Sequence, residues 1–217
     1  MDLEGLWEHA KGHLLRRYPE GEAMLEGWRR ETPDRMDDRD LLREYGWVVA
    51  TCGLTARAIE PRWEALGSAL GGWDPEAALQ AGPEPALAVL RNRRKVEAIL
   101  WLARVLAESP GIMGTLAREG ALAPVLERFR QWPFIGPTNA FHLARNLGWD
   151  TVARSGPVVR LAEFFGYDAE ELCDEIGLLV GERRREVDLV LWRWGIDVGD
   201  QAMLRWADLY RSLTPAG

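Results

Sequence analysis

The chain has 217 residues, a length that fits one large domain or two small lobes sharing a core. Its 34 acidic and 27 basic side chains give a formal net charge of -7, which predicts weak non-specific binding to DNA, so any contact with nucleic acid must be local. No apolar run approaches the roughly 18 residues that span a bilayer, so we expect no membrane-spanning helix.

The first residues, MDLEGLWEHAKGHLLRRYPEG, are charged and amphipathic and lack the apolar core of a signal peptide. We therefore expect a cytoplasmic monomer without membrane association. The two cysteines, Cys52 and Cys173, are too few for a cysteine-framed cluster or zinc site, and we interpret both as reduced thiols. His9 and His13 lie four residues apart, but no third ligand is recognisable, so we expect no metal and no cofactor.

The apolar residues follow helical spacing along nearly the whole chain, and no segment alternates with the period of a strand. In the first half we expect helices over 3–17, 38–52, 55–70, a short segment from 75, and 92–108. Asp37 or Asp38 is the expected N-cap of the second helix, and Asp74 caps the helix that begins at Pro75. Pro61 lies either in the first turn of its helix or at a kink.

In the second half we expect two helices before the segment at Gly136, and then helices near 139–147, 158–165, 169–180, 182–194 and 199–213. The predicted fold class is all-α, as one domain over 1–217. The glycine and prolines of 82–85 suggest a boundary between helical lobes of roughly 35–85 and 90–165. The terminal helices, within 1–30 and 166–213, are expected to pack together.

The segment WPFIGPTNAFHLARNLGWDTVARSGPVVR, residues 132–160, is the most informative stretch. A proline and a glycine lead directly into an apolar helix that Gly148 ends. The unpaired backbone amides at the start of such a helix attract an anion without any lysine. We therefore predict a contact with a DNA phosphate at Phe134, Ile135, Gly136 and Thr138.

Residues 132–140, WPFIGPTNA, resemble the hairpin of the helix-hairpin-helix DNA glycosylase superfamily, and FHLARNLG at 141–148 resembles its second helix. Upstream, the segments 53–55, 59–70, 73–74 and 91–99 are similar in order and spacing to the 3-methyladenine DNA glycosylase I branch. The resemblance covers about residues 40–165. It implies an all-α fold of two helical lobes with a cleft for DNA and an extruded base, with Arg160 at the position of a superfamily arginine.

The chain departs from this family at several positions. Ser155 and Pro157 stand where the superfamily usually carries a catalytic aspartate and a histidine, and Phe134 replaces the first hairpin glycine. Thr138 occupies the position of the Schiff-base lysine of the bifunctional enzymes, so we expect no β-lyase activity. In the 3-methyladenine branch a glutamate on an early helix replaces the aspartate, but its position here is Val48.

Glu44 lies one helical turn before Val48 and is the best candidate for the catalytic carboxylate. It precedes the mostly apolar run YGWVVATCG, where a carboxylate must be paired, raised in pKa, or functional. The alternative interpretation is a first-turn glutamate stabilised by the helix dipole or by an arginine. Ser155 is a second candidate, for holding a water or a phosphate oxygen, unless it is only the remnant of a lost catalytic position.

Tyr45, Trp47 and Trp192 are candidates for the base pocket, because an aromatic face attracts a positively charged alkylated purine. Ordinary core packing is the alternative for each of them. Arg93 and Lys95 belong to a basic cluster that can touch the second DNA strand or can form a solvated helix face.

The sequence thus predicts a monofunctional DNA glycosylase that flips and removes a damaged, alkylated base from duplex DNA. An alkylated purine is a good leaving group and needs little general-acid assistance. Ser155 and Pro157 favour the alternative of a catalytically silent DNA-binding or lesion-sensing protein on the same fold. A third hypothesis is an all-α scaffold for protein partners that binds no DNA at any salt concentration.

Overall fold

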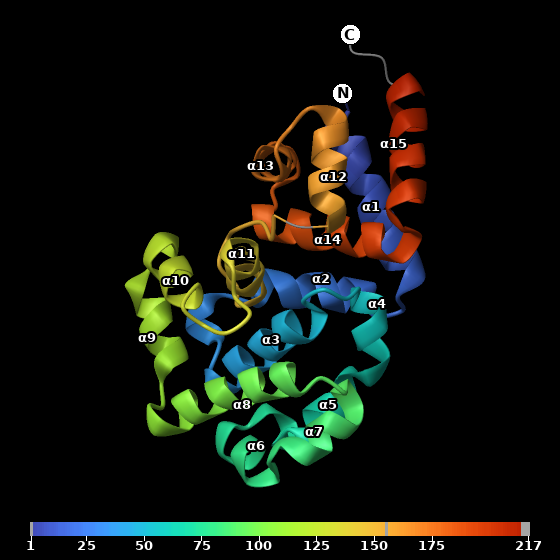
Figure 1. Ribbon diagram of the computed structural model, residues 1–217. Helices are drawn as coiled ribbons and strands as arrows, with labels where there is room; N and C mark the ends of the chain where they lie inside the picture. Colours follow the sequence, from blue (N-terminus) through green and yellow to red (C-terminus); the bar gives the residue numbers. More distant parts are fainter. Residues whose placement is uncertain (1, 155, 214–217) are drawn as a thin grey trace. The chain divides into compact units, whose positions relative to one another are not determined.

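A computed structural model describes residues 2–154 and 156–213, which form the short helices of Figure 1. Within these ranges no residue belongs to a β-strand, so the predicted all-α fold class is confirmed. No helix among the described residues is long and apolar enough to cross a membrane.

The α-helices of the first half are α1 (Leu3–Arg17), α2 (Gly21–Arg30), α3 (Asp38–Thr51), α4 (Ala56–Ile59), α5 (Trp63–Ala69), α6 (Pro75–Ala81), α7 (Pro83–Leu90) and α8 (Arg93–Glu108). Those of the second half are α9 (Ile112–Glu119), α10 (Leu122–Phe129), α11 (Pro137–Asn146), α12 (Gly156–Phe165), α13 (Ala169–Val180), α14 (Arg184–Val198) and α15 (Asp200–Leu213). Single turns of 3-10 helix lie at η1 (Pro33–Arg35), η2 (Glu60–Arg62) and η3 (Gly71–Trp73).

The chain divides into two compact units. The central unit is Glu31–Trp149, and the terminal unit combines Met1–Arg30 with Asp150–Gly217. The predicted lobe boundary at 82–85 falls inside the central unit, where α6 and α7 both pack against α8. In the terminal unit, α1 packs against α13 and α14, so the two ends of the chain share one core.

The central unit is built around α3, which contacts both α8 and α11. A capping box starts α3: Asp37 Oδ1 accepts the amides of Arg39 and Asp40, each at 2.9 Å, and the Asp40 carboxylate accepts the Asp37 amide at 3.2 Å. The buried side chains of this core are contributed by helices from α3 to α11 and include Leu41, Leu42, Val49, Ile99, Leu102, Phe129 and Leu143. This packing fixes the start of α11 relative to the end of α3.

Several helices differ from those that the sequence predicts. The segment 55–70 is not continuous, because Pro61 lies in a turn of 3-10 helix that separates α4 from α5. Gly82, with a φ of 69°, ends α6, and α7 begins at the next residue, where the sequence suggested only a break. The helix α2 and the extension of α14 to Val198 were not predicted.

Candidate functional site

The turn between α10 and α11 has a fixed backbone. The Ile135 amide donates to the Trp132 carbonyl at 3.1 Å, Pro133 follows Trp132, and Phe134 has a φ of 64°. Proline followed by a left-handed residue is the pattern of a type II turn, which normally requires glycine. A side chain in that conformation costs about 1 kcal/mol, and the Phe134 ring packs against the central core.

Two side chains hold this turn in place. Tyr45 on α3 donates its hydroxyl to the Pro133 carbonyl at 2.9 Å, and Asn139 Nδ2 donates to the Phe134 carbonyl at 2.9 Å. Tyr45 is completely buried, and burial raises the pKa of its phenol. We expected Tyr45 to line a base pocket, but in this structure it belongs to the core and anchors the turn.

The start of α11 is open to solvent. Gly136 is the N-cap in an extended conformation, and no side chain caps the helix. Gly136, Pro137 and Thr138 are exposed, whereas the Ile135 side chain is buried. Pro137 has no N–H to offer, so the backbone donors of the first turn are the amides that follow it. These amides and the helix dipole give this end of α11 a local positive potential.

The starts of α8 and α11 meet at the end of α3. Lys95 Nζ donates to the carbonyls of Ala50 and Cys52 at 2.8 and 2.7 Å, and Asn139 Nδ2 lies 3.8 Å from Cys52 Sγ. Lys95 is only 5% exposed, and burial lowers the pKa of its ammonium group. We expected Lys95 to touch DNA, but its charge instead caps the last carbonyls of α3.

Exposed side chains surround this meeting point. Leu54, two residues after Cys52, is 53% exposed. Arg91, Arg93 and Arg94 are exposed at the junction of α7 and α8. Arg93 makes only long ion pairs, at 3.7 and 3.8 Å, to two exposed glutamates, and such surface pairs contribute less than about 1 kcal/mol. Its guanidinium is therefore readily available to a phosphate.

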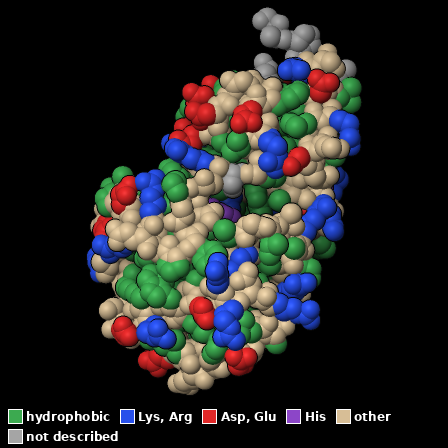
Figure 2. Space-filling view, viewed as in Figure 1, with side chains coloured by type: hydrophobic (Ala, Val, Ile, Leu, Met, Phe, Trp, Pro, Cys, Tyr) green, Lys and Arg blue, Asp and Glu red, His purple; other side chains and the backbone are tan. Residues whose placement is uncertain are grey.

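On the face drawn in Figure 2, neither sign of charge forms a large continuous patch. Figure 2 shows basic, acidic and apolar side chains intermixed over the visible face of each unit. Any attraction of a polyanion must therefore come from a local arrangement of donors, as the net charge of -7 already implies.

Glu44 lies on α3, with both carboxylate oxygens hydrogen-bonded. Arg43 Nε donates to Oε1 at 3.0 Å, and Asn146 Nδ2, from the end of α11, donates to Oε2 at 2.9 Å. Burial raises the pKa of Glu44, although Arg43 and Asn146 oppose that effect. The side chain as a whole keeps 18% of its surface exposed. Its pairing with Arg43 agrees with the alternative interpretation of an ion pair.

Trp47 is half-buried on α3, next to a small aromatic cluster. The ring centroids of Trp47 and Trp63 lie 5.1 Å apart in an edge-to-face arrangement, and those of Trp63 and Trp73 lie 4.6 Å apart. Gly46 allows this packing, because a Cβ there would lie 2.6 Å from the Trp73 ring. Trp47 is thus packed against the central core and is only partly exposed.

The remaining predicted site residues belong to the terminal unit. Arg160 on α12 is 43% exposed and pairs with Asp200 at 2.6 Å. Trp192 on α14 is half-buried and packs against the core of that unit. Ser155 lies outside the described residues. Arg160 and Trp192 therefore belong to the terminal unit, whereas Glu44 and the turn at 132–136 belong to the central unit.

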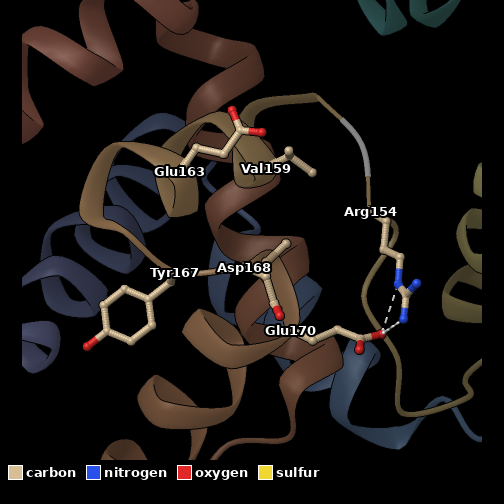
Figure 3. A pocket seen from close by; sticks show the side chains of 7 residues that line it. Arg154, Val159, Glu163, Tyr167, Asp168 and Glu170 are labelled. Atoms are coloured by element: carbon tan, nitrogen blue, oxygen red, sulfur yellow. Dashed lines mark hydrogen bonds and ion pairs between the residues drawn. The ribbon is translucent and has the colours of Figure 1, made fainter.

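Figure 3 shows a hollow of about 390 Å³ in the terminal unit. Its described lining is Arg154, Val159, Glu163, Tyr167, Asp168, Ala169 and Glu170. Arg154 Nη2 points at Glu170 Oε1 and pairs with it at 2.8 Å. Since three carboxylates share the lining with this neutralised arginine, the hollow repels a phosphate backbone and is a poor candidate for contact with DNA.

His142, in the middle of α11, has a buried Nε2 atom without a hydrogen-bond partner among the described residues. Burial, and to a lesser degree the charge of Arg145, lowers the pKa of His142 to about 3. Its imidazole is therefore neutral near pH 7 and is a poor proton donor. No group of three potential metal ligands occurs among the described histidine, cysteine, aspartate and glutamate side chains.

Comparisons with known proteins give no relative: no family model matches the chain, and neither a curated protein nor a solved structure is found to match it. The function must therefore be inferred from the geometry of the chain itself. That geometry adds Leu54, Asn139 and Asn146 to the residues of interest. The sequence carried no signal for the two asparagines, because their partners are known only after folding.

Proposed function

We propose that this chain is a monofunctional DNA glycosylase of the helix-hairpin-helix type that removes a damaged, alkylated base from duplex DNA. The observation that carries the proposal is the exposed, uncapped start of α11 behind a rigid turn. A phosphate oxygen bound there accepts hydrogen bonds from main-chain amides in a positive local potential. Through this contact an acidic protein can bind one DNA strand.

Two neighbouring features support the same proposal. Leu54 is exposed beside the start of α11, and we propose that it enters the base stack when the lesion is flipped out. The exposed arginines at the junction of α7 and α8 supply charge for phosphate contacts of the other strand, Arg93 in particular. Within the terminal unit, Arg160 and Trp192 remain candidates for DNA and base contacts.

The proposed chemistry uses Glu44. Cleavage of a glycosidic bond develops positive charge at the sugar, which a nearby carboxylate stabilises, and an alkylated purine leaves without strong protonation. Trp47 is partly exposed, and we propose that its ring contacts such a cationic base. The ammonium group of Lys95 donates to the carbonyls of Ala50 and Cys52, which supports hydrolysis without a Schiff base.

Two observations favour a second candidate function. Both oxygens of Glu44 are already hydrogen-bonded, and Ser155 replaces the usual aspartate of the superfamily. A catalytically silent protein that binds damaged DNA through the same α11 surface has these properties too. The two functions share the DNA interface and differ only in base release.

The DNA interface is tested by a matched pair of substitutions at Gly136. A Cβ there meets nothing within 4 Å, and Asp and Asn are equally good N-caps, so Gly136→Asp and Gly136→Asn are both expected to fold normally. Both side chains can accept the first-turn amides, so the two variants differ only in charge. The aspartate repels the phosphate and should bind duplex DNA at least about tenfold more weakly than the asparagine does. Fluorescence anisotropy at stated salt measures the difference.

Equal affinity of the two variants would remove α11 from the interface. Absence of duplex binding by the wild type, even at low salt, would favour the protein scaffold instead. Catalysis is tested separately, by incubation with duplexes that each carry one defined lesion and alkaline cleavage of the abasic product. Release by the wild type and its loss in Glu44→Gln are expected for the enzyme, whereas binding without release identifies the silent lesion sensor.

A further inference from the structure

Asn146, the last residue of α11, bridges two charged side chains of the central unit. Its Nδ2 donates to Glu44 Oε2 at 2.9 Å, while its Oδ1 accepts from Arg145 Nε at 3.2 Å and from Arg145 Nη2 at 2.8 Å. A guanidinium only donates and a carboxylate only accepts. The amide therefore has one orientation that satisfies both neighbours.

This arrangement fixes the Glu44 carboxylate from two sides. Arg43, on the same helix, holds Oε1, and Asn146, which is 102 residues away in the sequence, holds Oε2. A carboxylate with two directed donors loses the freedom to rotate about its last bond. The remaining exposed surface of the side chain, 18%, then faces solvent in a defined direction.

The same helix carries the proposed phosphate contact at its other end. From Thr138 to Asn146 is eight residues, which at 1.5 Å per residue is about 12 Å along the helix axis. That length equals the axial rise of about three to four nucleotides in a duplex. Because α11 is one continuous helix, a DNA phosphate bound at its start lies at a fixed distance from the Glu44 carboxylate, which Asn146 holds at its end.

We propose that Asn146 is a positioning residue that aims Glu44 at the sugar of a flipped nucleotide, with α11 setting the distance from the gripped phosphate. This inference rests on the proposed glycosylase function. It assigns Asn146 no contact with the substrate, since the amide acts through the carboxylate. Replacing it should therefore change the rate of base release and its pH dependence, and leave DNA affinity nearly unchanged.

The test is single-turnover base release from a duplex carrying one 7-methylguanine, measured across pH at saturating protein. In Asn146→Asp, the donor to Glu44 is lost and a second carboxylate lies beside it. We expect release at least about tenfold slower, with the acidic limb of the profile moved to higher pH. Duplex affinity should stay within about twofold. Gln80→Glu makes the same amide-to-acid change at an exposed position of α6 and serves as the control.

Two further variants keep the test decisive. In the Glu44→Gln background, Asn146→Asp should cause no additional loss, because its effect passes through Glu44. If Asn146→Asp does not fold, as judged by circular dichroism, Asn146→Ser retains a neutral donor and should slow release without moving the acidic limb upward. Base release in Asn146→Asp that matches Gln80→Glu would overturn the positioning role alone. Absence of base release by the wild type from any lesion would overturn the glycosylase proposal, and this inference with it.

Discussion

The two ends of α11 have opposite environments. At its start, Gly136, Pro137 and Thr138 are exposed, and no side chain caps the helix. At its end, Gly148 has a φ of 93° and its amide donates to the Arg145 carbonyl, while the Trp149 amide donates to the Ala144 carbonyl. This is a Schellman motif, in which the last carbonyls of a helix are satisfied.

The end of α11 serves the stability of the fold, whereas its start is suited to binding a ligand. Satisfied backbone groups and close packing at the end of α11 contribute to folding. Unsatisfied donors at its start contribute little to folding and remain available to a ligand. A glycine flanks each end of α11, Gly136 at the start and Gly148 at the end, so the presence of a glycine does not explain the difference. It lies in what the rest of the central unit places nearby. Substitutions along α11 can therefore test the two roles separately.

The largest expected effect is the acid sensitivity conferred by His142. Its pKa is near 3 in the folded protein and 6.5 in a model peptide, so the unfolded chain binds a proton that the folded protein excludes. The free energy of unfolding should fall as the pH drops from 6.5 towards 3, by roughly 3 kcal/mol at pH 4. His142→Phe should flatten this slope in urea unfolding measured at pH 4 and pH 7.

Other groups also contribute to that pH profile. Glu44, with its raised pKa, acts in the opposite direction, because its stabilisation is lost as the pH rises through the folded pKa. His9 also has a pKa lowered by burial. The difference in slope between wild type and His142→Phe isolates His142, and His9→Gln is the comparison. Equal slopes for wild type and His142→Phe would show that the imidazole is not buried as described.

The two glycines that flank α11 should respond differently to alanine. A Cβ at Gly148 would lie 2.8 Å from the Thr32 backbone, and its left-handed conformation adds strain, so Gly148→Ala should lower the free energy of unfolding by about 2–3 kcal/mol. At Gly136, whose φ is -83°, alanine meets no atom and should change stability by less than about 0.5 kcal/mol. Thermal and urea unfolding measure both, and similar losses would contradict the contrast.

A smaller effect separates the two basic residues of the predicted cluster. Lys95→Met leaves two carbonyls of α3 without their charged donor and should cost about 1–3 kcal/mol of stability. Arg93→Gln should leave the free energy of unfolding within about 0.5 kcal/mol of the wild type. It should also reduce the slope of log affinity for duplex DNA against log salt concentration by about one. Stability measurements and a salt titration of binding test both. Unchanged stability in Lys95→Met would contradict the structural role of its ammonium group.

The sequence by itself determined most of the helices. Period and capping chemistry are local, so Asp37 before α3, Asp74 before Pro75 and the glycine after α11 fixed their boundaries within a few residues. Local pattern also indicated an anion-attracting segment before α11; in the structure Gly136, Pro137 and Thr138 are exposed, whereas Ile135 is buried and its amide already donates to the Trp132 carbonyl. The pattern did not reveal that Phe134 takes a left-handed conformation, which usually requires glycine.

Only the tertiary structure decided what the polar side chains do. Lys95 and Tyr45 occur in stretches that are compatible with a surface role, but their partners lie at Cys52 and Pro133, 43 and 88 residues away. The same holds for Glu44, whose second donor comes from Asn146. A buried hydrogen bond depends on two distant segments reaching about 3 Å from each other, which only the packing of the whole unit fixes. Helices follow from neighbours in the sequence, whereas the site follows from neighbours in space.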